Sequence, residues 1–205
     1  MIVTHILIAL TVVVSIIAFN NRNLYRRLLF NAYDIKHFNN HHRFITYGFL
    51  HADWMHLIVN MFVLFMFGSI VEQYFAYMWP GKGWFYYLLL YLGGIVMSTI
   101  PSFGKHNEDY SYNAVGASGA VSSVLFASIL FEPLEKVYFY FIPIGIPAVI
   151  FGVLYLIYSW YMSKKNIDNI GHDVHFWGAV FGLVFTLALK PSLAVRFIDI
   201  IAQAV

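Results

Sequence analysis

The chain has 205 residues, of which 60% are hydrophobic and 11% are charged, and its mean hydropathy is +0.70. These values lie outside the range of soluble globular domains and indicate an integral, multi-pass membrane protein. The formal net charge of +2 arises from scattered Lys and Arg residues, which argues against a nucleic-acid surface. The absence of cysteine excludes a disulfide framework, a thiolate nucleophile and a cysteine zinc site.

Six uncharged runs lie between the charged residues, and a helix that crosses a bilayer needs about 20 mainly apolar residues. The runs cover residues 1–21, 54–71, 83–104, 110–131, 137–163 and 174–189. An all-α membrane protein with six transmembrane helices is therefore predicted, as a single domain over residues 1–205. The first run has no basic start and no small-residue cleavage site, so we expect it to be retained in the mature chain.

The first helix is predicted over residues 2–19, and its isolated polar residues Thr4, His5 and Ser15 are given no role. The long segment that follows, residues 20–53, mixes arginine and lysine with aromatic residues. Aromatic rings favour the membrane interface, and cations favour the headgroup phosphates. We therefore expect this first loop to lie on or partly in the membrane surface, in contact with membrane lipids.

The second helix is predicted over residues 54–74 and carries two polar residues on one face. His56 and Asn60 stand four positions apart, so they project from the same side of a helix. His51 lies five positions before His56 and is expected to point elsewhere if the helix extends that far. Polar residues within a span usually face the protein interior and often mark function. The alternative is that a neighbouring helix simply satisfies each of them.

The third helix is predicted over residues 84–100, followed by a loop over residues 101–113. The fourth begins near the run Gly-Ala-Ser-Gly-Ala at residues 116–120. Because small residues flank Ser118, another backbone can approach its hydroxyl closely, and its place near the helix start leaves it within reach of water. The alternative is a helix-packing patch, since small residues line most contacts between membrane helices.

The fifth helix is expected to follow Pro143 and Pro147 and to end before Lys164. After the sixth helix, the chain becomes too polar to span a membrane. Polar residues of this tail lie on one side of a short amphipathic pattern. Residues 193–205 are therefore predicted to form an interfacial helix.

The sixth helix carries a histidine at the head of a stripe of small residues. His175, Gly178, Ala179 and Gly182 fall at positions i, i+3, i+4 and i+7, which share one face of a helix. Such a stripe can pack closely against the small residues of the fourth helix. This packing would bring His175 near Ser118.

These residue types permit acyl transfer by a serine nucleophile. A serine hydroxyl needs a base to remove its proton, and the imidazole of His175 is the candidate base for Ser118. The developing oxyanion needs preorganised donors, for which His56, Asn60 and the backbone N–H of Ser118 are the candidates. Asp173 falls off the stripe of His175, so a dyad is favoured over a triad. The His-Glu-x-x-His pattern of metalloproteases is absent, so no such metal site is expected.

Three motifs on the second, fourth and sixth predicted helices resemble those of the rhomboid intramembrane serine proteases. They are His-Leu-Ile-Val-Asn at residues 56–60, Gly-Ala-Ser-Gly at residues 116–119 and His-x-x-Gly-x-x-x-Gly at residues 175–182. The resemblance implies a six-helix rhomboid-like bundle with a long membrane-interfacial first loop. It also implies a serine endopeptidase that cleaves transmembrane protein substrates and needs no separate cofactor.

The same resemblance implies roles for individual residues. Ser118 is the nucleophile, His175 is the general base, and His56, Asn60 and the Ser118 N–H form the oxyanion hole. Structural or accessory roles fall to His51, Glu72, Gly116, Gly119, Gly178 and Gly182. The resemblance also implies a bacterial inner membrane and a cytoplasmic amino terminus. The latter places four Lys and Arg residues inside and eight outside, against the positive-inside tendency.

Two positions depart from the family pattern. His42 precedes Arg43 where the family often has Trp-Arg, and Ser122 stands four residues after the nucleophile, where some members have an aromatic that packs on the catalytic histidine. Either His175 is held less tightly or another aromatic takes this place. An alternative function is that of an inactive rhomboid-like protein that binds transmembrane clients, although such relatives are expected to lose the serine or the histidine. A transporter is a further alternative, without a buried ion-pair relay to favour it.

Overall fold

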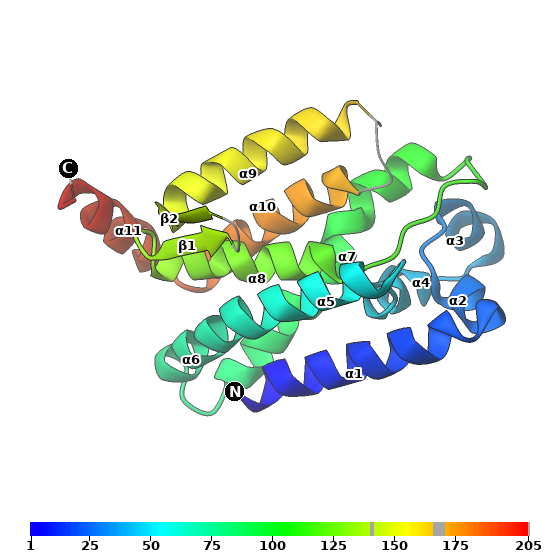
Figure 1. Cartoon of the computed structure of the whole chain (residues 1–205), viewed down its shortest axis with the longest axis horizontal. Coiled ribbons are helices and arrows are strands. Elements are labelled where there is room, and N and C mark those ends of the chain that lie inside the picture. The colour runs from blue at the N-terminus through cyan, green and yellow to red at the C-terminus, as the bar shows by residue number, and fades with distance from the viewer. Residues whose placement is uncertain (140–141, 166–170, 205) are drawn as a thin grey trace.

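The computed structural model describes residues 1–139, 142–165 and 171–204, which form a bundle of helices (Figure 1). A short hairpin and several short helical segments join the long helices. The helices are α1 (Ile2–Phe19), α2 (Arg22–Leu28), α3 (Ala32–Phe38), α4 (Arg43–Thr46), α5 (Trp54–Val63), α6 (Ser69–Met78), α7 (Gly83–His106), α8 (Ser118–Phe131), α9 (Ala148–Ser163), α10 (His172–Leu189) and α11 (Ser192–Ala202).

Among the residues that the structure describes, four helices are long and apolar enough to cross a membrane, as expected of a multi-pass membrane protein. They are α1, the continuous helix Trp54–Met78, α7 and α10. The second of these joins α5 to α6 through the π-helical segment Leu64–Gly68. The other two apolar helices, α8 and α9, have 14 and 16 residues and are shorter than a typical span.

The centre of the bundle is α8, which Figure 1 shows between α5 and α10, with α9 along the outer edge. Every residue of α8 after Ser118 is buried. Two glycines of α10 allow this close approach, because a Cβ at Gly178 would collide with the carbonyl of Gly119, and one at Gly182 with the carbonyl of Ser123. The stripe of small residues therefore does pack α10 on α8, in parallel.

The third helix is longer than the predicted range of residues 84–100. α7 continues through Pro101 to His106, so residues 101–106 are helical rather than part of a loop. Proline removes one backbone donor and normally ends a helix. Tertiary contacts outweigh that cost here, because Ser98, Thr99 and Ser102 are buried and the hydroxyl of Ser102 donates to Asp173 of α10 at 2.5 Å.

The first loop is a folded layer of short helices rather than an irregular segment. It contains α2, α3, α4 and a turn of 3-10 helix at Tyr47–Phe49 (η1). Asparagines cap two of these helices: Asn21 accepts from the N–H of Leu24 and Asn31 from that of Asp34. The layer lies at the same end of the bundle as the starts of α5, α8 and α10 (Figure 1).

A short antiparallel hairpin, β1 (Lys136–Phe139) and β2 (Ile142–Pro147), precedes α9 and is absent from the sequence prediction. The helix that follows begins after Pro147 and ends at Ser163, as predicted. The tail is also helical, as α11, with only Leu193 buried. A helix is therefore present over most of the predicted range 193–205, and its place at the membrane interface stays a prediction.

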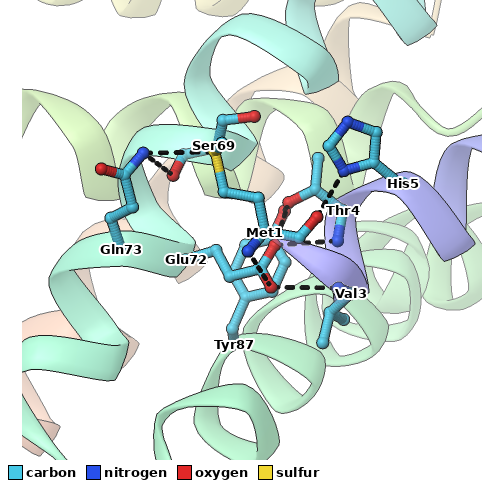
Figure 2. A network of polar contacts seen from close by, with 8 residues as sticks. All are labelled: Met1, Val3, Thr4, His5, Ser69, Glu72, Gln73 and Tyr87. Atoms are coloured by element: carbon cyan, nitrogen blue, oxygen red, sulfur yellow. Dashed lines mark hydrogen bonds and ion pairs between the residues drawn. The ribbon is translucent and has the colours of Figure 1, made fainter.

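Glu72 holds the start of α1 against α6 (Figure 2). Its carboxylate accepts hydrogen bonds from the N–H groups of Val3 and Thr4 at 3.0 and 2.9 Å, and from the Thr4 hydroxyl at 2.6 Å. The amino group of Met1 lies 3.4 Å from the same carboxylate, and the Thr4 hydroxyl also contacts Tyr87 at 3.0 Å. A carboxylate is favourable here because the first N–H groups of a helix lack partners within it. Thr4 therefore has a structural role.

Candidate active site

Ser118 is the first residue of α8 and is only partly buried, unlike the rest of that helix. The first N–H groups of a helix have no partner within it and form its positive end. Gly116, two residues earlier, has a φ of 127°, a conformation that side chains rarely adopt. Its N–H donates to the carbonyl of Tyr47 at 3.1 Å, which fixes the turn leading into Ser118.

His56 lies against this turn. A Cβ on Gly116 would fall 2.7 Å from Cε1 and 2.9 Å from Nε2 of His56, and 3.8 Å from the hydroxyl of Ser118. The glycine therefore leaves room for the imidazole beside the serine. The N–H of Ala52 donates to Nδ1 of His56 in a long contact of 3.5 Å. Because Nδ1 accepts, the proton of the neutral ring is assigned to Nε2, the nitrogen nearest to Gly116.

Asn60 lies one turn along the same helix and is buried. Its side-chain amide donates to the carbonyl of His56 at 2.9 Å. An amide NH₂ has two hydrogens, so this bond leaves one available to another acceptor.

His175 is brought towards Ser118 by the packing of α10 on α8. It lies one turn before Gly178, which contacts Gly119, the residue directly after Ser118. The hydroxyl of Ser123 strengthens this contact by donating to the carbonyl of Gly178 at 2.8 Å. Because α8 and α10 run in parallel, their first turns, with Ser118 and His175, lie at the same end of the bundle.

An aromatic residue of α9 lies beside His175. The rings of Tyr155 and His175 have centroids 6.3 Å apart and planes 23° from parallel. The Tyr155 hydroxyl shares a hydrogen bond of 2.7 Å with Ser122 of α8. The structure therefore favours the possibility that another aromatic takes the place left by Ser122. A tyrosine from another helix lies next to the histidine, anchored by the serine that replaces the expected aromatic.

His51 does not point away from His56, because the helix begins only at Trp54 and His51 precedes it. The two rings meet edge to face, with centroids 4.9 Å apart. Nδ1 of His51 lies 3.0 Å from the hydroxyl of Ser15, which donates to the carbonyl of Phe49. Burial, and secondarily the neighbouring His56, lower the pKa of His51 to about 3, so it is neutral at physiological pH. Ser15 therefore also has a structural role.

Sequence reasoning missed two residues that fix the turn before Ser118. Tyr47 is fully buried, and its hydroxyl donates to the carbonyl of Ile95 at 2.6 Å. The backbone carbonyl of Tyr47 accepts from the N–H of Gly116. The buried amide of Asn31 donates to the carbonyls of Tyr110 and Tyr112 at 3.0 and 3.2 Å. Neither residue belongs to a recognisable motif, and only their burial in the folded chain reveals them.

The first loop is also paired directly with the segment that leads to the serine. Phe30 and Ala114 exchange two backbone hydrogen bonds of 3.0 Å in an isolated antiparallel bridge. His42 stands where the rhomboid pattern often has a tryptophan, and its Nε2 lies 3.1 Å from the carbonyl of Arg27. The next residue, Arg43, is buried and forms an ion pair with Asp34.

The carboxylate of Asp173 is engaged away from the stripe of His175. It accepts from the hydroxyl of Ser102 on α7 and, at 2.9 Å, from the N–H of Val174. The bond from Ser102 fastens the first turn of α10 to α7. Gly119 allows α8 to pack closely on α7, because a Cβ there would collide with the hydroxyl of Ser98.

Comparison with known families identifies the bundle. The Rhomboid domain family matches residues 39–192, which include every candidate site residue described above. The chain belongs to the rhomboid family. Its match begins within the first loop and ends at the start of α11, so α1 lies outside it.

Three similar proteins come from Arabidopsis thaliana and carry rhomboid-like names. RHOMBOID-like protein 5 is 31% identical over 73% of this chain and 45% of its own length. "RHOMBOID-like protein 12, mitochondrial" is 26% identical over 70% and 45%, and "Rhomboid-like protein 11, chloroplastic" is 27% identical over 74% and 54%. The chain thus spans about half the length of these relatives. Their names give no support to a bacterial inner membrane.

Proposed function

We propose that this rhomboid is an intramembrane serine endopeptidase that cleaves transmembrane protein substrates through a dyad of Ser118 and His175. The observation that carries the proposal is the crowding at Gly116. His56 and the Ser118 hydroxyl both lie against this glycine, and the start of α8 supplies N–H groups that have no partner within the helix.

In the proposed reaction, the hydroxyl oxygen of Ser118 attacks the carbonyl carbon of the scissile peptide while His175 accepts its proton. The carbonyl oxygen becomes an oxyanion, for which Nε2–H of His56, the free amide hydrogen of Asn60 and the N–H of Ser118 are the donors. His175 then returns the proton to the leaving amine as the C–N bond breaks. A water molecule hydrolyses the acyl-enzyme with His175 again acting as base.

Membrane insertion is part of the same proposal. We take α8 and α9 as the remaining two transmembrane helices of a six-helix bundle, and the first loop as an element of the membrane interface. With a cytoplasmic amino terminus, the first loop and the starts of α5, α8 and α10 face the external side. The short length of α8 is consistent with this, because its surroundings are protein rather than lipid.

Labelling with a serine-directed fluorophosphonate tests the nucleophile. The purified wild type should be labelled, and Ser118→Ala should lose the label while retaining its thermal transition in detergent. Ser123→Ala is a matched control, because it removes a hydroxyl of the same helix that is engaged in packing. A wild type that is neither labelled nor able to cleave a reconstituted transmembrane substrate would instead support an inactive, client-binding protein.

A further inference from the structure

A cleft of about 620 Å³ lies outside the candidate active site, where α1 meets the first loop. Three arginines, Arg22, Arg26 and Arg43, line it together with a single carboxylate, that of Asp34. These residues define the basic cleft. The end of α1 forms its apolar wall with Phe19.

The charges in the basic cleft are unevenly paired. Arg43 is buried, and its guanidinium is used by the protein: it donates to the carbonyl of Leu29 at 2.7 Å and pairs with Asp34 at 3.0 Å. Arg22 and Arg26 are exposed, and neither forms an ion pair or a hydrogen bond through its side chain within the part of the chain that the structure describes. They stand four residues apart on α2 and so share one face. The cleft therefore presents two uncompensated positive charges.

A second, apolar opening of about 230 Å³ lies between α1 and the same loop. Leu10, Val14, Leu28, Thr46 and Phe49 line it, and we call it the apolar slot. Its polar side chain, Thr46, donates its hydroxyl to the carbonyl of Leu28 at 2.7 Å. The slot therefore offers a ligand only apolar contacts.

The two openings follow one side of α1. Leu10 and Val14 line the apolar slot, and Ala18 lines the basic cleft. These residues are spaced by four, so they lie along the same face of the helix. Leu28 and Leu29, which are adjacent in sequence, line one opening each. A ligand with an anionic group and a hydrocarbon chain would match both openings at once.

We propose that the basic cleft and the apolar slot together bind one anionic phospholipid, with its phosphate at Arg22 and Arg26 and an acyl chain in the slot. The basic cleft lies at the end of a membrane-spanning helix, which is the depth of the headgroups. Guanidinium groups bind phosphate oxygens in a planar, often bidentate geometry. A free anion would fill the basic cleft alone. Lipid binding here does not depend on proteolytic activity.

The test uses the full chain in a phosphate-free maltoside detergent, titrated with dioctanoyl phosphatidylglycerol, and native mass spectrometry to count the lipid retained. Arg22→Gln combined with Arg26→Gln should weaken binding roughly 10- to 30-fold, since each basic residue near an anionic headgroup contributes about a factor of five. Lys164→Gln with Lys165→Gln, the matched loss of two exposed charges at the end of α9, should leave it unchanged. Equal weakening by both pairs would overturn the proposal.

A second arm distinguishes a lipid from a free anion. Val14→Trp fills the apolar slot and should weaken binding of the lipid without changing the binding of inorganic phosphate. Dioctanoyl phosphatidylcholine should bind more weakly than the anionic lipid, because its choline opposes the charge of the cleft. If inorganic phosphate binds as tightly as the lipid and Val14→Trp affects neither, the basic cleft is an anion site and the phospholipid proposal fails.

Discussion

α8 and α9 are both short apolar helices, yet the protein surrounds one and leaves most of the other open. Every residue of α8 after Ser118 is buried, whereas α9 has only three buried residues. The exposed apolar residues of α9 are Ile150, Val153, Leu154, Ile157, Tyr158, Trp160 and Tyr161. Small residues at the contacts of α8 allow neighbouring backbones to approach, but the large side chains of α9 keep them apart. The serine therefore stands on a helix that protein encloses, and Tyr155 on a helix with a large exposed apolar face.

The largest expected effects concern the reacting groups at the start of α8 and α10. His175→Ala should reduce cleavage to background, as should Ser118→Ala, because no base then removes the serine proton. Asn60→Ala removes one oxyanion donor and should lower kcat by about 10²–10³. His56→Ala should resemble Asn60→Ala. Single-turnover cleavage of a reconstituted transmembrane substrate measures each, and a folded His175→Ala variant with near-normal cleavage would disprove the dyad.

Two glycines test the difference in packing between α8 and α9: Gly182 of α10 contacts α8, and Gly152 belongs to α9. Gly182→Ala drives a methyl group into the backbone carbonyl of Ser123 and should cost roughly 3 kcal/mol of unfolding free energy. Gly152→Ala on α9 meets the end of the Ile129 side chain at 2.9 Å, which can rotate away, so the cost should stay below about 1 kcal/mol. Unfolding in mixed detergent micelles measures both. Equal losses would contradict the contrast between the two helices.

The stability of the folded protein should also decrease at acid pH, through His51 in the first loop. The pKa of this histidine is lowered from 6.5 to about 3 in the folded chain, so protonation favours the unfolded state. The part of the unfolding free energy that this pKa difference supplies is fully present above about pH 6.5 and is lost as the pH falls towards 3. Going from pH 7 to pH 5 should cost about 2 kcal/mol. His51→Asn should reduce this dependence, and an unchanged pH profile of stability would exclude His51 as its source.

Smaller effects than those at Gly182 and His51 are expected at the hydrogen bond that links α9 to α8, and the effect of this bond on catalysis rests on the proposed function. Tyr155→Phe removes the hydrogen bond to Ser122 and should cost about 1 kcal/mol, whereas Ser122→Ala leaves a tyrosine hydroxyl without this partner and should cost somewhat more. The double variant should be no worse than Ser122→Ala alone.

If Tyr155 positions His175, Tyr155→Phe keeps the ring and should retain most of kcat. Tyr155→Leu should lower kcat with little change in KM. A Tyr155→Leu variant that changes only KM would place this tyrosine in substrate binding instead.

The sequence was sufficient to predict α1, α9 and the pairing of small residues between α8 and α10, because composition and spacing directly determine these features. It was insufficient for α7, whose passage through Pro101 depends on contacts with α10. The stacking of Tyr155 beside His175 was also out of reach, since the two residues come from different helices. Tyr47 and Asn31 could not be found because each acts through backbone groups distant in sequence.

The bridge between Phe30 and Ala114 bears on how this protein could be divided. The region shared with the rhomboid family starts at residue 39, but Phe30, Asn31 and Ser15 lie before it and hold the chain around Gly116 and His51. A fragment cut at the family boundary would lose these supports and keep every reacting group. Expressed together as two separate polypeptides, residues 1–38 and 39–205 should reassemble, because the contacts between them are backbone pairs and buried polar bonds. The unit of folding is larger than the unit of family resemblance.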